Sequence, residues 1–143
     1  MTVKLRTGGE YTPTTDDSPF TRLGGEEGVF ALANAFYDDM EVHEPELTAA
    51  HRQDAPGKVA KVSRERFGLF LVGWLGGPQH YMEKHGHPRL RMRHAQVQID
   101  EKMRDAWLRS MGRAMDSRAV TGGLRDFLNG RFAEVAEFLR NVT

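Results

Sequence analysis

The sequence predicts an all-α protein built as one domain. The chain has 143 residues, a common domain size that is long enough to bury a continuous apolar core. Apolar residues recur at steps of three and four in several long stretches, which is the spacing of one helical face. No stretch alternates apolar and polar residues as a half-exposed strand does. We therefore expect one helical domain over residues 20–143.

Residues 1–19 differ from the rest of the chain in composition. They contain Gly8, Gly9, Pro13 and Pro19 in a stretch rich in Thr, Asp and Ser, and they show no apolar periodicity. Such a segment offers too little apolar surface to offset the entropy of ordering it. We expect an N-terminal extension that is flexible and has no part in the core.

The first long helix is predicted directly after Gly24 and Gly25. Glu26 and Glu27 stand in its first turn, where negative charge interacts favourably with the helix dipole. One face of this helix is apolar and is formed by Val29, Leu32, Ala33, Phe36, Tyr37 and Met40. This face should pack into the core.

A break and a second long helix are predicted next. Residues 43–57 contain two prolines and mixed charges, and Pro56 suits the first turn of a new helix because its missing N–H needs no partner there. The apolar side of that helix comprises Val59, Val62, Phe67, Phe70, Leu71 and Trp74. Gly76, Gly77 and Pro78 should end it, and a loop-rich segment should follow to Pro88.

Three further helices complete the expected domain. Pro88 can open a short helix that runs through Leu90 to His94, and Asp100 is a suitable N-cap for the next helix. The stripe of that next helix is Met103, Trp107, Met111 and Met115. The stripe of the last helix is Leu124, Phe127, Leu128, Phe132, Val135, Phe138, Leu139 and Val142.

Composition excludes several classes of function. Lys plus Arg equal Asp plus Glu at 20 each, so no net field attracts nucleic acid or an anionic membrane surface. The absence of cysteine excludes disulfides and thiolate metal sites. No window reaches the roughly 18 consecutive apolar residues of a membrane span, and residues 1–10 lack a secretory apolar segment. A cytoplasmic protein with a small-molecule partner is the expectation.

The histidines are the first candidates for chemistry. Glu83, His85 and His87 could suggest a divalent metal site, but the intervening glycine and the following proline indicate a loop with solvated side chains. His94 differs because it follows three alternating arginines. Haem carries two propionates that arginine can bind, and a neutral imidazole can hold its iron. On these residues alone, a solvated basic turn with an incidental histidine is the simpler interpretation.

Tyr37 and Trp107 are the second candidates. Both rings fall on apolar helix faces and should point inward, where a phenol or an indole needs a hydrogen-bond partner. Ordinary core packing, with a backbone carbonyl as that partner, is the simpler interpretation of periodicity alone.

One long motif resembles a known family. It runs through Gly76-Gly77-Pro78, Tyr81, Lys84-His85-Gly86-His87-Pro88-Arg89-Leu90-Arg91-Met92-Arg93-His94-Ala95 and Arg104-Asp105-Ala106-Trp107-Leu108-Arg109, with Leu23-Gly24-Gly25 and Phe36-Tyr37 upstream. This pattern resembles the signature of group II truncated haemoglobins. The resemblance implies a truncated globin, a two-over-two α-helical sandwich around haem b, in which His94 is the proximal iron ligand.

The resemblance also implies the residues on the distal side of the haem. Tyr37 and Trp107 correspond to two hydrogen-bond donors to a diatomic ligand at the iron. His51 corresponds to a third distal group, although the chain between it and Gly76 is a few residues longer than the family pattern. Ser63 takes the place where larger globins have a distal histidine, and Phe67 would wall the pocket.

The remaining contacts that the resemblance implies lie along the haem edge and around its propionates. They are Arg66, Phe70, Tyr81, His87, Arg91, Met92, Val97 and Met111. Arg91 is the best match to a propionate ligand. Two departures concern this site, because Gln96 and Gln98 flank Val97 where the family has proline and phenylalanine, and because residues 51–56 are extended.

The function implied is reversible binding of dioxygen and other diatomic ligands, carbon monoxide and nitric oxide included, at a five-coordinate haem iron. This fits oxygen transport by a monomer or weak homodimer. An enzymatic alternative is nitric oxide dioxygenase or peroxidase-like activity, which would need a separate reductase. A third reading is a haem-free helical interaction module in which the aromatic stripes are only core.

Overall fold

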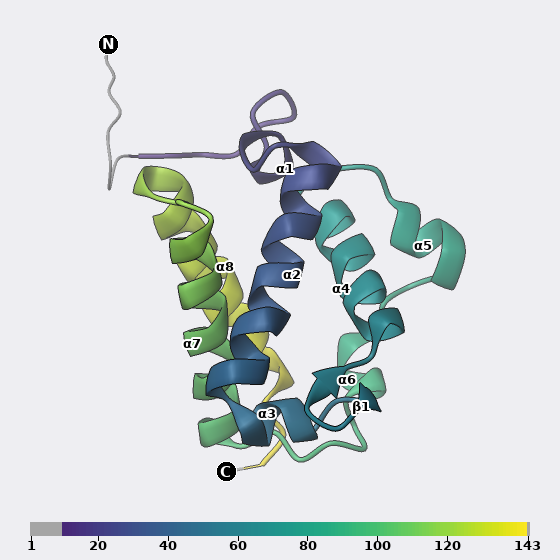
Figure 1. The fold of residues 1–143 in the computed structure, drawn as a ribbon. Coiled ribbons are helices and arrows are strands. Elements are labelled where there is room, and N and C mark those ends of the chain that lie inside the picture. Colours follow the sequence, from purple (N-terminus) through teal and green to yellow (C-terminus); the bar gives the residue numbers. More distant parts are fainter. Residues whose placement is uncertain (1–9, 143) are drawn as a thin grey trace.

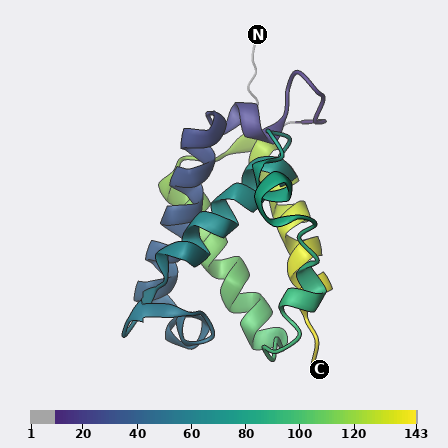
Figure 2. The same cartoon turned by 90° about the vertical axis from the view of Figure 1, so that its right-hand side faces the viewer.

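Four long helices form two layers of two in the computed structural model, which describes residues 10–142. α2 (Gly25–His43) and α4 (Lys61–Trp74) form one layer, and α7 (Glu101–Ser117) and α8 (Gly122–Leu139) form the other. Figure 1 shows α2 between α4 and α7, and Figure 2, turned by a quarter, shows α6 (Leu90–Arg93) near the lower part of α8. The predicted all-α class and two-over-two arrangement are confirmed.

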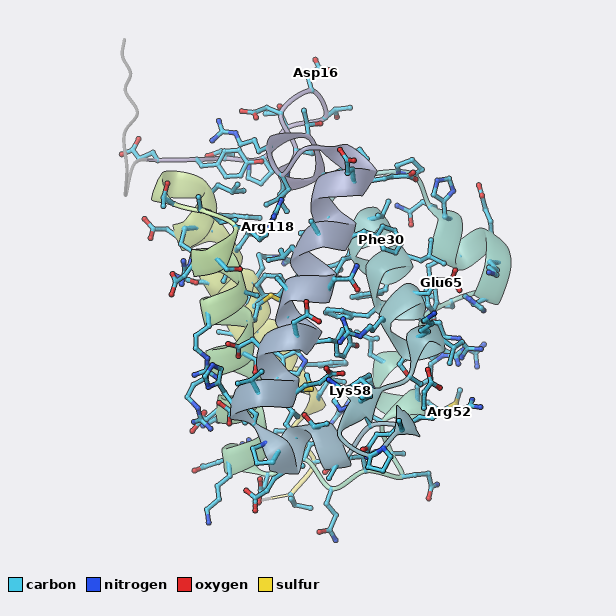
Figure 3. The ribbon with its side chains drawn as sticks, in the orientation of Figure 1. Asp16, Phe30, Arg52, Lys58, Glu65 and Arg118 are labelled. Carbon is cyan, nitrogen blue, oxygen red and sulfur yellow. The ribbon has the colours of Figure 1, made fainter. Side chains whose placement is uncertain are left out.

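The central helix α2 packs through the face predicted from its periodicity. Val29, Leu32 and Met40 are fully buried in the core that all four long helices share. α4 approaches α2 closely at Gly68, where an added Cβ would lie 2.3 Å from Cε1 of Phe30. Figure 3 shows Phe30 between these two helices. A side chain at position 68 would therefore push α4 away from α2.

The connection from α2 to α4 differs from the prediction. It contains α3 (Pro45–Ala49) and an antiparallel pair of strands, β1 (Gln53–Ala55) and β2 (Lys58–Val59), so the expectations of no strand and of a helix opening at Pro56 are wrong. Pro56 and Gly57 form the turn, and Gly57 has a φ of +77° that suits glycine. Val59 N–H donates to Glu41 of α2 at 2.8 Å, a bond from a residue distant in the chain.

The segment after α4 is also more helical than predicted. α5 (His80–His85) occupies the stretch expected to be a loop, and that expectation is wrong. Arg89 adopts a left-handed conformation with a φ of +48°, so α6 begins at Leu90 and ends at its C-cap His94. The predicted cap of α7 is confirmed, because Asp100 Oδ1 accepts from Met103 N–H at 2.9 Å.

Residues 10–18 and the short helix α1 (Pro19–Arg22) lie at one end of the helices. The Tyr11 ring packs edge-on against Phe127 of α8, and the Arg22 guanidinium lies 4.1 Å from the centre of the Tyr11 ring. The Tyr11 hydroxyl donates to the Asp17 carbonyl. Residues 1–9 of the extension predicted for residues 1–19 lie outside the described residues.

A buried carboxylate joins the segment between α2 and α3 to α7. Glu44 accepts two hydrogen bonds from Arg109, at 3.0 and 2.9 Å, and a third from Arg113 at 2.6 Å. The side chain of Glu44 is only 11% exposed. These charge-assisted bonds lower the pKa of Glu44 to about 2, and Arg109 contributes most to the shift.

We expect Glu44→Gln to reduce the free energy of unfolding by about 2 kcal/mol at pH 7. The carboxylate stabilises the fold fully above its ordinary pKa near 4.5, and this contribution is lost as pH falls toward 2. Urea unfolding at pH 7 and pH 3 measures it, with Glu46→Gln, an exposed neighbour on α3, as the control. A Glu44→Gln deficit of equal size at both pH values would contradict this prediction.

Candidate functional site

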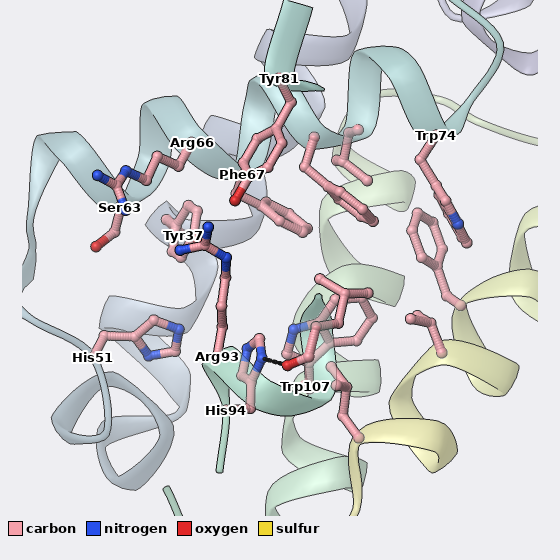
Figure 4. A pocket seen from close by; sticks show the side chains of 16 residues that line it. Tyr37, His51, Ser63, Arg66, Phe67, Trp74, Tyr81, Arg93, His94 and Trp107 are labelled. Carbon is pink, nitrogen blue, oxygen red and sulfur yellow. Dashed lines mark hydrogen bonds between the residues drawn. The ribbon is translucent and has the colours of Figure 1, made fainter. Parts of the chain in front are cut away.

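A cavity of about 540 Å³ opens between the two helical layers, within the roughly 300–1,000 Å³ typical of small-molecule and cofactor sites. Figure 4 shows its side chains, which come from α2, α4, α5, α6, α7 and α8 and from the segment after α3. The lining residues are Tyr37, His51, Ser63, Arg66, Phe67, Phe70, Leu71, Trp74, Tyr81, Leu90, Arg93, His94, Trp107, Phe132, Val135 and Leu139.

A second cavity of about 270 Å³ adjoins the first. The residues that line both are His51, His94, Trp107, Val135 and Leu139. Ile99 and Met103 add further apolar wall to the second cavity. Together the two spaces form a largely apolar slot with His51, His94 and Trp107 at their junction.

His94 directly follows the one-turn helix α6. Its Nδ1 lies 2.7 Å from the Leu90 carbonyl oxygen, the bond drawn in Figure 4. A carbonyl oxygen only accepts, so Nδ1 carries the proton and Nε2 of the neutral ring keeps a lone pair. This hydrogen bond also fixes the ring orientation, as is usual for a histidine that ligates a metal.

Tyr37 and Trp107 belong to a cluster of aromatic rings at the cavity wall. The rings of both pack against Phe36 and Phe67, with centroids 5.0–6.3 Å apart. Tyr37 is 5% exposed, and burial raises the pKa of its phenol, so the hydroxyl stays protonated. Within residues 10–142 neither the Tyr37 hydroxyl nor the Trp107 indole N–H has a hydrogen-bond partner. Two donors are therefore available to a ligand in the cavity.

His51 follows α3 and is held in the same way as His94. Its Nδ1 donates to the Leu47 carbonyl at 2.8 Å, and its ring meets the Tyr37 ring edge-on at 5.8 Å. Burial lowers the pKa of His51, so the ring is neutral near pH 7. Its Nε2 therefore presents a lone pair, which accepts a hydrogen bond but does not donate one.

The structure brings most of the predicted contacts to the cavity. Ser63, Arg66, Phe67, Phe70 and Tyr81 all line it, together with the predicted ligand and distal residues. Val97 lines the second cavity and a shallow surface pocket beside it.

Four predicted cofactor contacts do not line either of the two cavities. His87 and Met92 are exposed, and Met111 is buried in the core that the helices share. The Arg91 guanidinium lies over the Phe138 ring at 5.0 Å, away from the cavity. In this arrangement, contact of these four with a cofactor has no geometric support.

Arg93, which was not predicted as a site residue, lines the cavity, whereas Arg91 does not. Arginines two apart on a helix point in different directions, so the alternating pattern could bring only some of them to the cavity. Val135 and Leu139, also missed as lining residues, stand one turn apart on the apolar stripe of the last helix. This four-residue spacing could have identified both as residues on the inward face of the helix.

The residues present fit a haem group. The walls are mostly aromatic and aliphatic, as a porphyrin requires, and the Nε2 of His94 is a suitable iron ligand. Arg66 and Arg93 can bind carboxylates, and the two donors without partners can donate to a polar ligand in the cavity. Within residues 10–142 no three His or acidic side chains converge on a metal site, so Glu83, His85 and His87 do not form one.

None of the helices in the described part of the chain is long and apolar enough to span a membrane.

Comparison with known proteins gives a consistent result. The family model for bacterial-like globins matches residues 18–141. The group 2 truncated hemoglobin YjbI of Bacillus subtilis (strain 168) is 36% identical over 127 residues, which cover 89% of this chain and 91% of that protein.

Solved structures agree in fold. The cold-adapted truncated hemoglobin of the Antarctic marine bacterium Pseudoalteromonas haloplanktis TAC125 is 38% identical, with a TM-score of 0.81 over 88% of this chain and 99% of that one. A truncated oxygen-avid haemoglobin from Bacillus subtilis is 35% identical, with a TM-score of 0.77 over 87% and 99% of the two chains. With its two-over-two helices and largely apolar cavity, this chain belongs to the group II truncated haemoglobins, in the bacterial-like globin family.

Proposed function

We propose that this globin holds haem b through Nε2 of His94 and reversibly binds dioxygen and other diatomic ligands at the iron. The observation that carries the proposal is the pairing, in one cavity, of an imidazole oriented by its bond to Leu90 with two donors that have no partner in the described residues. The bound haem would supply the iron that takes the diatomic ligand. The oxygen-avid relative from Bacillus subtilis supports dioxygen as the ligand.

Tyr37 and Trp107 have the chemistry to stabilise that ligand. Dioxygen draws negative charge from ferrous iron, and a buried O–H or N–H donor stabilises such charge best where water is excluded. His51 in its present tautomer offers only an acceptor, so we assign donation to Tyr37 and Trp107. Ser63 and Phe67 line the same cavity without a charge.

The cationic rim supports binding of the two propionates. Arg66 and Arg93 line the cavity, and neither forms an ion pair with a carboxylate within residues 10–142. Both lie near His85, whose pKa is lowered by desolvation and by the positive charges of Arg66 and Arg93. An anionic cofactor edge would neutralise this cluster.

Nitric oxide dioxygenase or peroxidase-like turnover is the second candidate, and the same rim favours it. Three arginines that form no ion pair within residues 10–142 line the two cavities, namely Arg52, Arg66 and Arg93. The two propionates of haem would neutralise two of these three positive charges and leave one unpaired. The surplus suits the acidic docking face of a separate reductase, which turnover would require.

The visible absorption spectrum tests the proposal most directly. We expect the protein purified with a haem supply to be red, and its reduced form to change spectrum on addition of carbon monoxide. A colourless protein, or a spectrum that carbon monoxide leaves unchanged, would reject the proposal and favour a helical interaction module. Sustained nitric oxide consumption with an external reductant would move the assignment to the enzymatic candidate.

A further inference from the structure

His51 lines the cavity, but the proposed binding of a diatomic ligand does not use it as a hydrogen-bond donor. Its Nδ1–H is bonded to the Leu47 carbonyl, and within residues 10–142 nothing donates to its Nε2. The lone pair of this nitrogen belongs to a ring that lines both cavities. This nitrogen is therefore free to bind a group placed in the cavity.

The environment of His51 repeats that of His94. Each imidazole donates Nδ1–H to the carbonyl four residues earlier, at 2.8 Å from Leu47 and 2.7 Å from Leu90. Each keeps its Nε2 lone pair, and the two rings are close enough that a charge on His94 disfavours one on His51. Figure 4 shows both rings in the same cavity, one from the segment after α3 and the other after α6.

We propose that His51 is a second, reversible axial ligand of the haem iron, which occupies through Nε2 the position where the diatomic ligand binds. This inference rests on the proposed function, because it needs haem held by His94. Two imidazoles whose Nδ1–H groups are bonded to carbonyls, and whose Nε2 atoms are left to coordinate, are a ligand set that iron accepts. Exchange is a plain substitution, in which the His51–iron bond breaks, the bond to the diatomic ligand forms, and neither partner changes its electron count.

Tyr37 is the other side chain that could take this position, and its chemistry disfavours it. Iron binds a phenolate more readily than a phenol, and burial keeps the Tyr37 hydroxyl protonated. His51 needs no such proton loss. It also stands at the end of the five-residue α3, before the β1–β2 turn, so its displacement would disturb none of the four long helices.

The proposal changes the expected binding behaviour. A five-coordinate iron, as the sequence resemblance implies, would exist only while His51 is displaced. The apparent affinity for a diatomic ligand equals the affinity of the open state multiplied by the fraction of molecules in that state. At high ligand concentration the binding rate should level off at the rate of His51 dissociation.

Low-temperature electron paramagnetic resonance of the ferric holoprotein tests the ligand set. We expect a low-spin signal from the wild type and from His43→Ala, a control at an exposed histidine on α2. His51→Ala and the more conservative His51→Gln should lose the low-spin signal and become high-spin. The carbon monoxide binding rate of the ferrous wild type should level off, and that of both His51 variants should rise linearly with concentration.

The outcomes separate this inference from the proposed function. A wild type without haem would defeat both. A wild type that binds haem and carbon monoxide but is high-spin would overturn only the role of His51. A low-spin signal that persists in His51→Ala and His51→Gln would overturn it too, and its loss in Tyr37→Phe would then identify Tyr37 as the ligand. Helix content by circular dichroism and haem stoichiometry confirm that each variant is folded.

Discussion

His94→Ala is expected to abolish stable haem binding. The imidazole is the one side chain that the family motif and the hydrogen bond to Leu90 both mark as the proximal ligand. Loss of a supporting group around a metal site weakens binding roughly 10- to 100-fold, and loss of the ligand itself should exceed that. Haem content per polypeptide after purification, and the rate of haem transfer to an acceptor protein, measure the effect.

His87→Ala is the matched control, because His87 belongs to the same motif but is exposed and does not line the cavity. It should retain haem as the wild type does. His94→Gly with imidazole in the buffer should regain an axial ligand and part of the haem. A His94→Ala protein with the unchanged ferrous spectrum of the wild type would disprove the assignment of the proximal ligand.

Trp107→Phe is expected to speed dioxygen dissociation roughly ten-fold or more. The indole N–H has no partner in the described residues, and loss of one buried donor costs about 1 to 3 kcal/mol. Phenylalanine keeps an aromatic ring against Phe36 and Phe132, so packing changes little. Stopped-flow displacement of dioxygen by carbon monoxide measures the dissociation rate.

Trp74→Phe is the control for this experiment. Trp74 lines the same cavity and packs against Phe70 and Phe132, but we assign it no donor role. Its dissociation rate should stay within about two-fold of the wild type, since ring packing is retained. If Trp107→Phe leaves the dissociation rate unchanged, Trp107 does not donate to the ligand and Tyr37 is its only donor.

The long helices could be predicted because their evidence is local. The stripes of α2 and α7 repeat every three or four residues, and each repeat depends only on helix geometry. The cap at Asp100 is equally local, since its acceptor is three residues from its donor. Such elements keep their character whatever they pack against.

The connections were predicted less well because distant residues stabilise them. The hairpin around Gly57 is held to Glu41, 18 residues away from its partner Val59, and no local pattern reveals that bond. α5 is only six residues long, so its apolar periodicity was too short to detect. Arg89 in a left-handed conformation decides where α6 begins, and with it which neighbouring arginine lines the cavity.

The amino-acid sequence by itself determined the all-α class, the inward faces of the long helices and the identity of His94 as the candidate iron ligand. These follow from spacing along one helix or from a contiguous motif. The tertiary structure alone decided that Arg93 rather than Arg91 lines the cavity and that His51 presents a lone pair rather than a donor. The physical reason is that orientation and tautomer depend on which backbone carbonyl or ring lies next to a side chain, and folding sets those neighbours.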